Sequence, residues 1–335
     1  MRTSLVTPAL WVFGSLLALA VVASFAVGAG AIHIGAGDIA RDVLGVQPLL
    51  PRDHAVVYSM RLPRLVLAML VGGILALAGA AYQSVFHNPL ADPYLLGVSS
   101  GAGLAVTLAV VGAGAAVGPR AVAAAFAGGL LAVAATYVAG SMARGGGSAT
   151  TVVLAGVAVG AFSNAAQTYV QQRHMDKVPA IYSWMLGNLG GASWRTVQVV
   201  AVVVALVAFA LVFGARTLDT MMVGDDEART LGLHPRAIRL SVVVAATLGT
   251  AAAVAAAGLI GFVGIIVPHT IRLVVGSGHR LVLPLCLIWG AVFLVFADTV
   301  GRTVLAPSEL SVGVVTAAIG APFFLYILVR SGRRL

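Results

Sequence analysis

The most informative absences in this sequence are those of charge and of cysteine. Asp, Glu, Lys and Arg make up only 9% of the 335 residues, against about 25% in ordinary soluble domains. So little charge excludes a soluble globular enzyme of the usual kind, and an apolar content of 60% excludes a disordered chain. The single cysteine, Cys286, excludes a disulfide framework and a thiolate metal cluster. The composition predicts a polytopic helical membrane protein.

Motifs for nucleotide and metal chemistry are also missing. Lys177 is the only lysine, so the chain has no Gly-x-x-x-x-Gly-Lys phosphate loop. No set of His, Glu and Cys has metal-ligand spacing. We therefore expect no catalytic residue, no metal and no cofactor in this chain. If transport is driven by ATP, a separate subunit must hydrolyse it.

Apolar runs of about 20 residues, the length that crosses a bilayer, recur along the whole chain. We predict an all-α fold with ten transmembrane helices in a single domain over residues 1–335. Nine is the alternative, because the seventh and eighth runs separate only if the chain breaks near Gly258. The first run is longer than the apolar region of a signal peptide, so we expect a retained helix. The predicted spans are 8–32, 63–86, 95–117, 120–142, 150–170, 194–214, 237–257, 258–275, 281–300 and 313–329.

Three glycine and proline positions repeat at one constant offset. The matched pairs are Gly79 with Gly258, Pro89 with Pro268, and Gly97 with Gly276. With ten spans the two copies run in opposite directions, as in the inverted repeats of transporters. The alternative is that proline and glycine simply end helices here.

Arginines gather at the predicted outer surface. Arg61 and Arg64 flank Pro63 just before the second span, and Arg302 follows Asp298 by four residues, on the same helix face. Together the three arginines would form a basic rim that pairs with an acidic partner. The alternative is that they are anchors at the membrane interface.

Two segments on the predicted inner side have unusual patterns. Two closely spaced prolines at 88–93 end a helix, and Gly97 and Gly101 then give a spacing suited to close helix packing. This segment is either a tight loop or a constriction in a path. Three acids at 225–227 suit the start of a short helix, and Gly232 suits its end. That helix is either a docking surface or a solvated connector.

The fifth span carries a polar stripe with helical spacing. Its members are Gly160, Ser163, Asn164, Gln167 and Gln171. Polar side chains at membrane depth face a cavity or another helix, and we favour a water-lined path over polar contacts between helices. Asp298 is the only acid within any predicted span, which disfavours a proton relay or a cation-coupled carrier.

Together these segments resemble the FecCD-type permease family, the membrane subunits of type II ABC importers for iron–siderophore complexes, haem and vitamin B12. The resemblance runs from about residue 55 to the C-terminus. Its motifs are Arg-Leu-Pro-Arg at 61–64, Asn-Pro-Leu-Ala-Asp-Pro at 88–93, Leu-Gly-Val-Ser-Ser-Gly-Ala at 96–102, Ala-Arg-Thr-Leu-Gly at 228–232, Gly-Phe-Val-Gly at 261–264, Val-Pro-His at 267–269 and Gly-Ala-Pro-Phe-Phe at 320–324. Single matches are Gly79, Gln83, Trp184, Gly187, Arg272, Asp298, Arg302, Glu309, Leu310 and Gly313.

The resemblance implies an inverted-repeat permease with ten helices and both ends in the cytoplasm, in the inner (plasma) membrane of a prokaryote. Two copies would pair around a central path. Two ATPase subunits, which hold ATP and Mg²⁺, would dock inside, and a periplasmic or lipid-anchored substrate-binding protein would dock outside.

The resemblance also implies roles for individual residues. Docking of the binding protein falls to Arg61, Arg64 and Arg302. Coupling to the ATPase, within about 216–236, falls to Asp225, Glu227, Ala228, Arg229, Leu231 and Gly232. The residues implied to form the path and its gates are Asn88, Leu90, Thr150, Thr151, Ser163, Asn164, Gln167 and Gln171.

The substrate expected first is an iron complex, a ferric siderophore or haem, with cobalamin close behind. Arg173 and His174, at the outer end of the stripe, could meet substrate carboxylates, or they could be interfacial anchors. The alternative functions are a stand-alone secondary transporter or channel, and a structural scaffold. A stand-alone carrier would have no use for a docking helix, and a scaffold would have none for a polar stripe.

Overall fold

The computed structural model describes residues 6–30, 34–114, 118–142 and 148–331, and within these ranges the chain is helical, with no strand. The elements in order are α1 (Val6–Gly28), α2 (Ala36–Val43), α3 (Pro51–Ala55), the π-helical turn η1 (Val56–Arg61), α4 (Leu62–Val85), α5 (Val98–Ala113), α6 (Pro119–Met142), α7 (Ala149–Arg173), the 3₁₀ turn η2 (Met175–Lys177), α8 (Val178–Met185), α9 (Trp194–Phe213), α10 (Ala215–Met221), α11 (Asp225–Thr230), α12 (Pro235–Ala257), α13 (Val263–Val275), α14 (His279–Thr303) and α15 (Val312–Ser331).

Seven helices in the described ranges are long and apolar enough to cross a membrane. They are Pro8–Gly28, Pro51–Val85, Pro119–Met142, Ala149–Arg173, Trp194–Phe213, Pro235–Ala257 and His279–Thr303. Shorter apolar helices, Val98–Ala113, Val263–Val275 and Val312–Ile327, lie where the other three spans are predicted. The prediction of an all-helical integral membrane protein is confirmed. The count of ten crossings stays a prediction.

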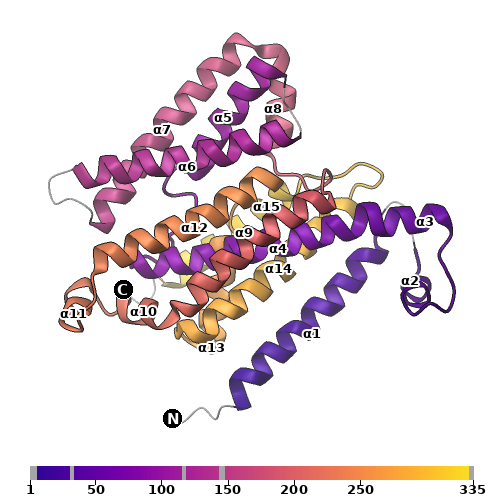
Figure 1. Cartoon of the computed structure of the whole chain (residues 1–335), viewed down its shortest axis with the longest axis horizontal. Coiled ribbons are helices and arrows are strands. Elements are labelled where there is room, and N and C mark those ends of the chain that lie inside the picture. Colours follow the sequence, from indigo (N-terminus) through magenta and orange to yellow (C-terminus); the bar gives the residue numbers. More distant parts are fainter. Residues whose placement is uncertain (1–5, 31–33, 115–117, 143–147, 332–335) are drawn as a thin grey trace.

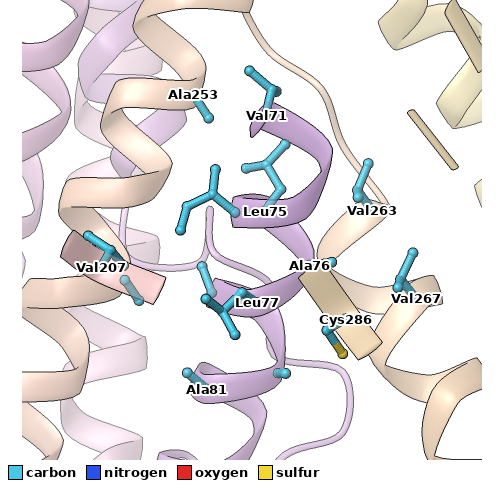
Figure 2. Close-up of a cluster of buried hydrophobic side chains, with 14 of the residues drawn as sticks. Val71, Leu75, Ala76, Leu77, Ala81, Val207, Ala253, Val263, Val267 and Cys286 are labelled. Carbon is cyan, nitrogen blue, oxygen red and sulfur yellow. The ribbon is translucent and has the colours of Figure 1, made fainter. Parts of the chain in front are cut away.

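Helix α4 is the centre of the main helix group. In the apolar 18-residue stretch of this helix 78% of the residues are buried, whereas only 17% are buried in the corresponding stretches of α1 and α7. It packs against α9, α12, α13 and α14, and its aliphatic side chains meet those of Val207, Ala253, Val267 and Cys286 from these four neighbours (Figure 2). Glycine allows the closest approach, because a Cβ at Gly79 would overlap the backbone of α13.

Helices α5, α6, α7 and α8 form a second layer beside this group (Figure 1). α12 connects the layers by packing against α5 and α6. The predicted role of Gly101 in close packing is confirmed, because a Cβ there would overlap the backbone of Gly128 in α6. Gly97 serves differently: its φ of +86° lets the chain turn into α5.

The second span begins earlier than predicted. Residues 51–61 lie outside the predicted span 63–86, yet a continuous helix runs from Pro51 to Val85. Pro51 occupies the first turn, where its missing N–H costs nothing, and Asp53 also lies in that turn. Pro63 is therefore inside the helix. The wider π-helical turn just before it offers room for a ring that would clash in a regular α-helix.

The predicted break near Gly258 is confirmed. α12 ends at Ala257, Gly258 has a φ of +74°, and α13 begins only at Val263. The matched repeat positions, however, occupy unlike places. Gly79 lies inside α4 whereas Gly258 follows α12, and Pro89 lies in a turn whereas Pro268 lies inside α13. This particular alignment of the two halves is therefore wrong, and it gives no support to an inverted repeat.

Candidate functional site

Charged and polar side chains gather at the two opposite ends of α4. α2 and α3 lie at the end where α4 begins, and α10 and α11 lie at the end where it finishes (Figure 1). We call these the outer and inner ends, following the predicted orientation.

At the outer end, Asp298 lies between two arginines. Arg64 Nη2 is 2.8 Å from Asp298 Oδ1, and Arg302 Nε is 3.1 Å from Asp298 Oδ2. Arg64 Nη1 also lies 2.9 Å from Glu309 Oε2. This arginine–carboxylate cluster ties α4 to α14 and to the segment before α15.

Arg61 and Arg302 also contact backbone carbonyls at the end of α1. Arg61 Nη1 donates to Val27 O at 2.7 Å and to Gly28 O, and Arg302 donates to Ala26 O at 3.0 Å and to Ala29 O. These carbonyls lack helical partners and favour cations.

The structure thus brings the three predicted docking arginines together, but not as an open basic rim. Arg61 is 8% exposed, and the side chains of Arg64 and Arg302 are 13% and 9% exposed. Glu309, at 47%, is the most exposed member of the cluster. Sequence reasoning missed this because the groups that bury the arginines come from α1 and from the segment before α15. Their docking role stays a prediction.

At the inner end, the predicted short helix is confirmed as α11. Asp225, Asp226 and Glu227 form its first turn. Gly232, with a φ of +78°, follows its end, where the Leu233 N–H donates to Ala228 O at 3.0 Å. Asp225 ties this helix to the bundle through an ion pair with Arg239 Nη2 at 2.9 Å.

The predicted coupling residues divide by exposure. Ala228 is fully buried, whereas Leu231 is 68% exposed and Glu227 and Arg229 are also on the surface. The exposed acids Asp226 and Glu227 and the exposed Leu231 thus belong to one short segment, whereas the Asp225 carboxylate is bonded to Arg239.

The two candidate gate segments are built by local hydrogen bonds. Asn88 Oδ1 accepts from Leu90 N at 2.9 Å, and Leu90 is 41% exposed. Ser148 Oγ caps α7 by accepting from Thr151 N at 3.2 Å, and Thr150 is exposed. Among the described residues, no hydrogen bond joins the two segments.

The polar stripe of α7 divides into two parts. Ser163 and Gln167 are buried, and Gln167 Nε2 lies 3.0 Å from Met185 Sδ of α8 while its Oε1 faces Gly103 of α5. Gln167 therefore makes a polar contact between helices, the alternative we did not favour, and Ser163 is buried beside it on the same helix. Asn164 is exposed and Gln171 is half-buried, so these two remain candidates for the path.

Arg173 and His174 lie exposed at the outer end of α7. The Arg173 guanidinium sits over the Tyr169 ring, 5.4 Å from its centroid, and His174 Nδ1 is 3.1 Å from Val170 O. Both contacts are local, and a role in substrate contact stays a prediction.

Sequence reasoning missed a tyrosine that ties the gate turn to the broken helix. Tyr94 Oη donates to Ile260 O at 3.0 Å and accepts from Ile260 N at 3.1 Å. One hydroxyl thus satisfies both backbone groups of a residue in the unwound segment 258–262. The only sign of this contact in the sequence is that a residue with a polar group, Tyr94, directly follows Pro93.

Comparison with known proteins gives a consistent result. The FecCD transport family model matches residues 16–330. The cobalamin import system permease protein of Halobacterium salinarum is 38% identical over 276 residues, 82% of this chain and 73% of that one. The hemin transport system permease protein of Yersinia pestis is 36% identical over 275 residues, 81% and 82% of the two chains. The iron(3+)-hydroxamate import system permease protein of Bacillus subtilis is 36% identical over 320 residues, 96% and 82% of the two chains.

A solved structure is also similar. A metal-chelate type ABC transporter in an inward-facing conformation superposes with a TM-score of 0.85 at 27% identity, covering 95% of this chain and 98% of that one.

Proposed function

The chain belongs to the FecCD transport family and is a permease subunit of an ABC importer, and from this premise we propose how it assembles and what it carries. Two copies form the translocation path, two ATPase subunits bind the inner end, and a substrate-binding protein binds the outer end. ATP hydrolysis takes place on the ATPase subunits.

The observation that carries this proposal is the placement of α11. It is a short acidic helix at one end of the bundle (Figure 1), next to the exposed side chains of Val223 and Leu231. A surface of this kind suits a partner with an apolar groove and basic residues. At the opposite end, the arginine–carboxylate cluster with its exposed Glu309 suits a charged partner.

The exposed side chains of α7 support pairing of two copies around a path. Exposed polar residues such as Asn164 and Thr168 share this helix with the exposed apolar Phe162 and Tyr169. We propose that the polar part lines the path and that the three shorter apolar helices also cross the bilayer. The subunit then has ten spans, with both ends on the cytoplasmic side of a prokaryotic plasma membrane.

For the substrate we propose an iron complex first, a ferric siderophore or haem, and cobalamin second. The test reconstitutes the chain in proteoliposomes with the ATPase and the binding protein encoded beside it, and measures uptake of all three compounds. ATP-dependent uptake of one compound alone would identify it. The control replaces the ATPase with a variant that binds but does not hydrolyse ATP.

The competing function, a carrier that works alone, predicts a different result. Such a carrier would purify without an ATPase and would take up its substrate without ATP. Uptake by the isolated chain in response to an ion gradient would overturn the proposed assembly with an ATPase.

A further inference from the structure

The buried guanidinium of Arg239 bridges two segments that the proposed function treats separately. Its Nε donates to Val85 O at 3.1 Å, in the last turn of α4. Its Nη2 donates to both carboxylate oxygens of Asp225, the first residue of α11, at 2.9 Å. The side chain of Arg239 is 2% exposed and that of Asp225 is 31% exposed. The ion pair therefore sits at the edge of the bundle, with its cation inside.

The ion pair of Arg239 with Asp225 links α11 to the rest of the bundle. Among the described residues it is the only ion pair that joins α11 to another element, since the pair of Arg229 with Asp226 stays within the helix. A partner that displaces α11 thus acts on Arg239 through a charge-assisted hydrogen bond, which is stronger and more directional than a neutral one.

A second bridge connects the neighbouring segment to the same turn of α4. His279 Nε2 lies 2.5 Å from Ser84 Oγ, and His279 Nδ1 lies 2.7 Å from Asp219 Oδ1 of α10. Ser84 and Val85 are consecutive, so α10 and α11 both reach the last turn of α4 through buried basic side chains.

The last turn of α4 is in turn bonded to the candidate gate. Asn88 N donates to Gln83 O at 3.2 Å, and Leu90 N donates to Asn88 Oδ1. A shift of the turn at 83–85 therefore moves Asn88 with it.

Resting on the proposed function, we propose that Arg239 is a positioning residue that transmits displacement of α11 to the end of α4 and so to the turn at 88–93. Movement of the ATPase displaces α11, the ion pair of Asp225 with Arg239 moves the guanidinium, and the hydrogen bond from Arg239 to the Val85 carbonyl moves the end of α4. Arg239 touches neither substrate nor nucleotide.

The test follows movement of the gate turn in the complex with the ATPase subunit. Cys286 is fully buried, so a Leu90→Cys substitution at a 41% exposed site gives a reporter for a membrane-impermeant maleimide with little background. The rate of labelling is measured with and without ATP, alongside ATP hydrolysis. The chains compared carry Leu90→Cys alone or together with Asp225→Asn, Asp225→Glu or Arg236→Lys.

The matched control is Arg236→Lys. Arg236 lies three residues before Arg239 on α12 and is exposed, and its side chain makes no hydrogen bond or ion pair within the described part of the chain. We expect this variant to keep the ATP-dependent change in labelling. Asp225→Glu should keep a large part of it, because the longer side chain retains the charge.

For Asp225→Asn we expect continued binding and hydrolysis of ATP with loss of the labelling change. Without the Leu90→Cys substitution, Asp225→Asn should lower uptake per ATP hydrolysed about tenfold, within the usual range of coupling between sites. If the labelling change survives in Asp225→Asn, or if hydrolysis and labelling fall together as they would from lost docking, the inference is wrong. If the complex of the unsubstituted chain assembles and shows no ATP-dependent uptake, the proposed function itself fails.

Discussion

Arg64 and Asp298 are separated by 234 positions in the chain, yet Arg64 donates to both carboxylate oxygens of Asp298 at 2.8 to 3.1 Å. The same carboxylate also meets Arg302. One buried acid is thus the shared counter-charge of two largely buried cations from two helices, whereas the second acid of Arg64, Glu309, is 47% exposed.

Removal of this acid should strongly destabilise the permease. Asp298→Asn leaves two buried guanidinium groups without their shared counter-charge, and breaking a buried ion pair in this way costs about 3–5 kcal/mol. We expect a clear drop in the melting temperature of the purified protein in detergent. Asp38→Asn removes an exposed acid from its pair with Arg41 and is the control, with an expected cost of about 0–1 kcal/mol. Equal effects of the two substitutions would contradict the role assigned to Asp298.

Contact between α4 and α13 should depend on the absence of a single methyl group. Gly79→Ala places a Cβ against the Gly264 backbone, so the helices must separate, and overpacking of this kind costs about 1–3 kcal/mol. Gly14→Ala in α1 meets nothing within 4 Å and should be neutral or slightly stabilising, because alanine favours a helix. Unfolding in a denaturing detergent would measure both. Similar stability of the two variants would rule out the close packing.

Glu309 should compete with the binding protein for Arg64. If Arg64 pairs with an acid of that partner, Glu309→Gln frees Nη1 and should tighten docking by up to about fivefold, the equivalent of the ~1 kcal/mol upper range of an exposed ion pair. The gain should shrink with added salt. Asp176→Asn, which removes an exposed acid paired with Lys177, serves as the control. Unchanged or weaker docking of Glu309→Gln would argue against a docking role for Arg64.

The features found from the sequence are those with local causes. α11 follows from three acids and a glycine at fixed spacing, and the break at Gly258 follows from a residue that tolerates a positive φ. The apolar runs located all seven long helices, because length and hydropathy decide which segments cross a bilayer.

The features that the sequence did not reveal depend on distant partners. Arg61 is buried because α1 ends beside it and offers two carbonyls, and no spacing within 61–64 encodes that. The bond of Tyr94 to Ile260 joins residues 166 positions apart. The two halves of the α7 stripe differ because α5 and α8 cover Gln167 and leave Asn164 open, and periodicity alone cannot say which part of a polar face a neighbour will cover.

Asn164 should therefore separate the path from the helix contacts. Asn164→Trp adds bulk to an exposed polar position and should abolish ATP-driven uptake if this face lines the path, while assembly with the ATPase and ATP hydrolysis continue. Phe162→Trp is the matched control: this position, 73% exposed, is turned about 160° away on the same helix, and uptake should persist. Gln167→Met should lower thermal stability without blocking uptake, because Gln167 lies between helices. Full uptake by Asn164→Trp would exclude Asn164 from the path, and equal inhibition by both tryptophans would show that α7 tolerates no added bulk on either face.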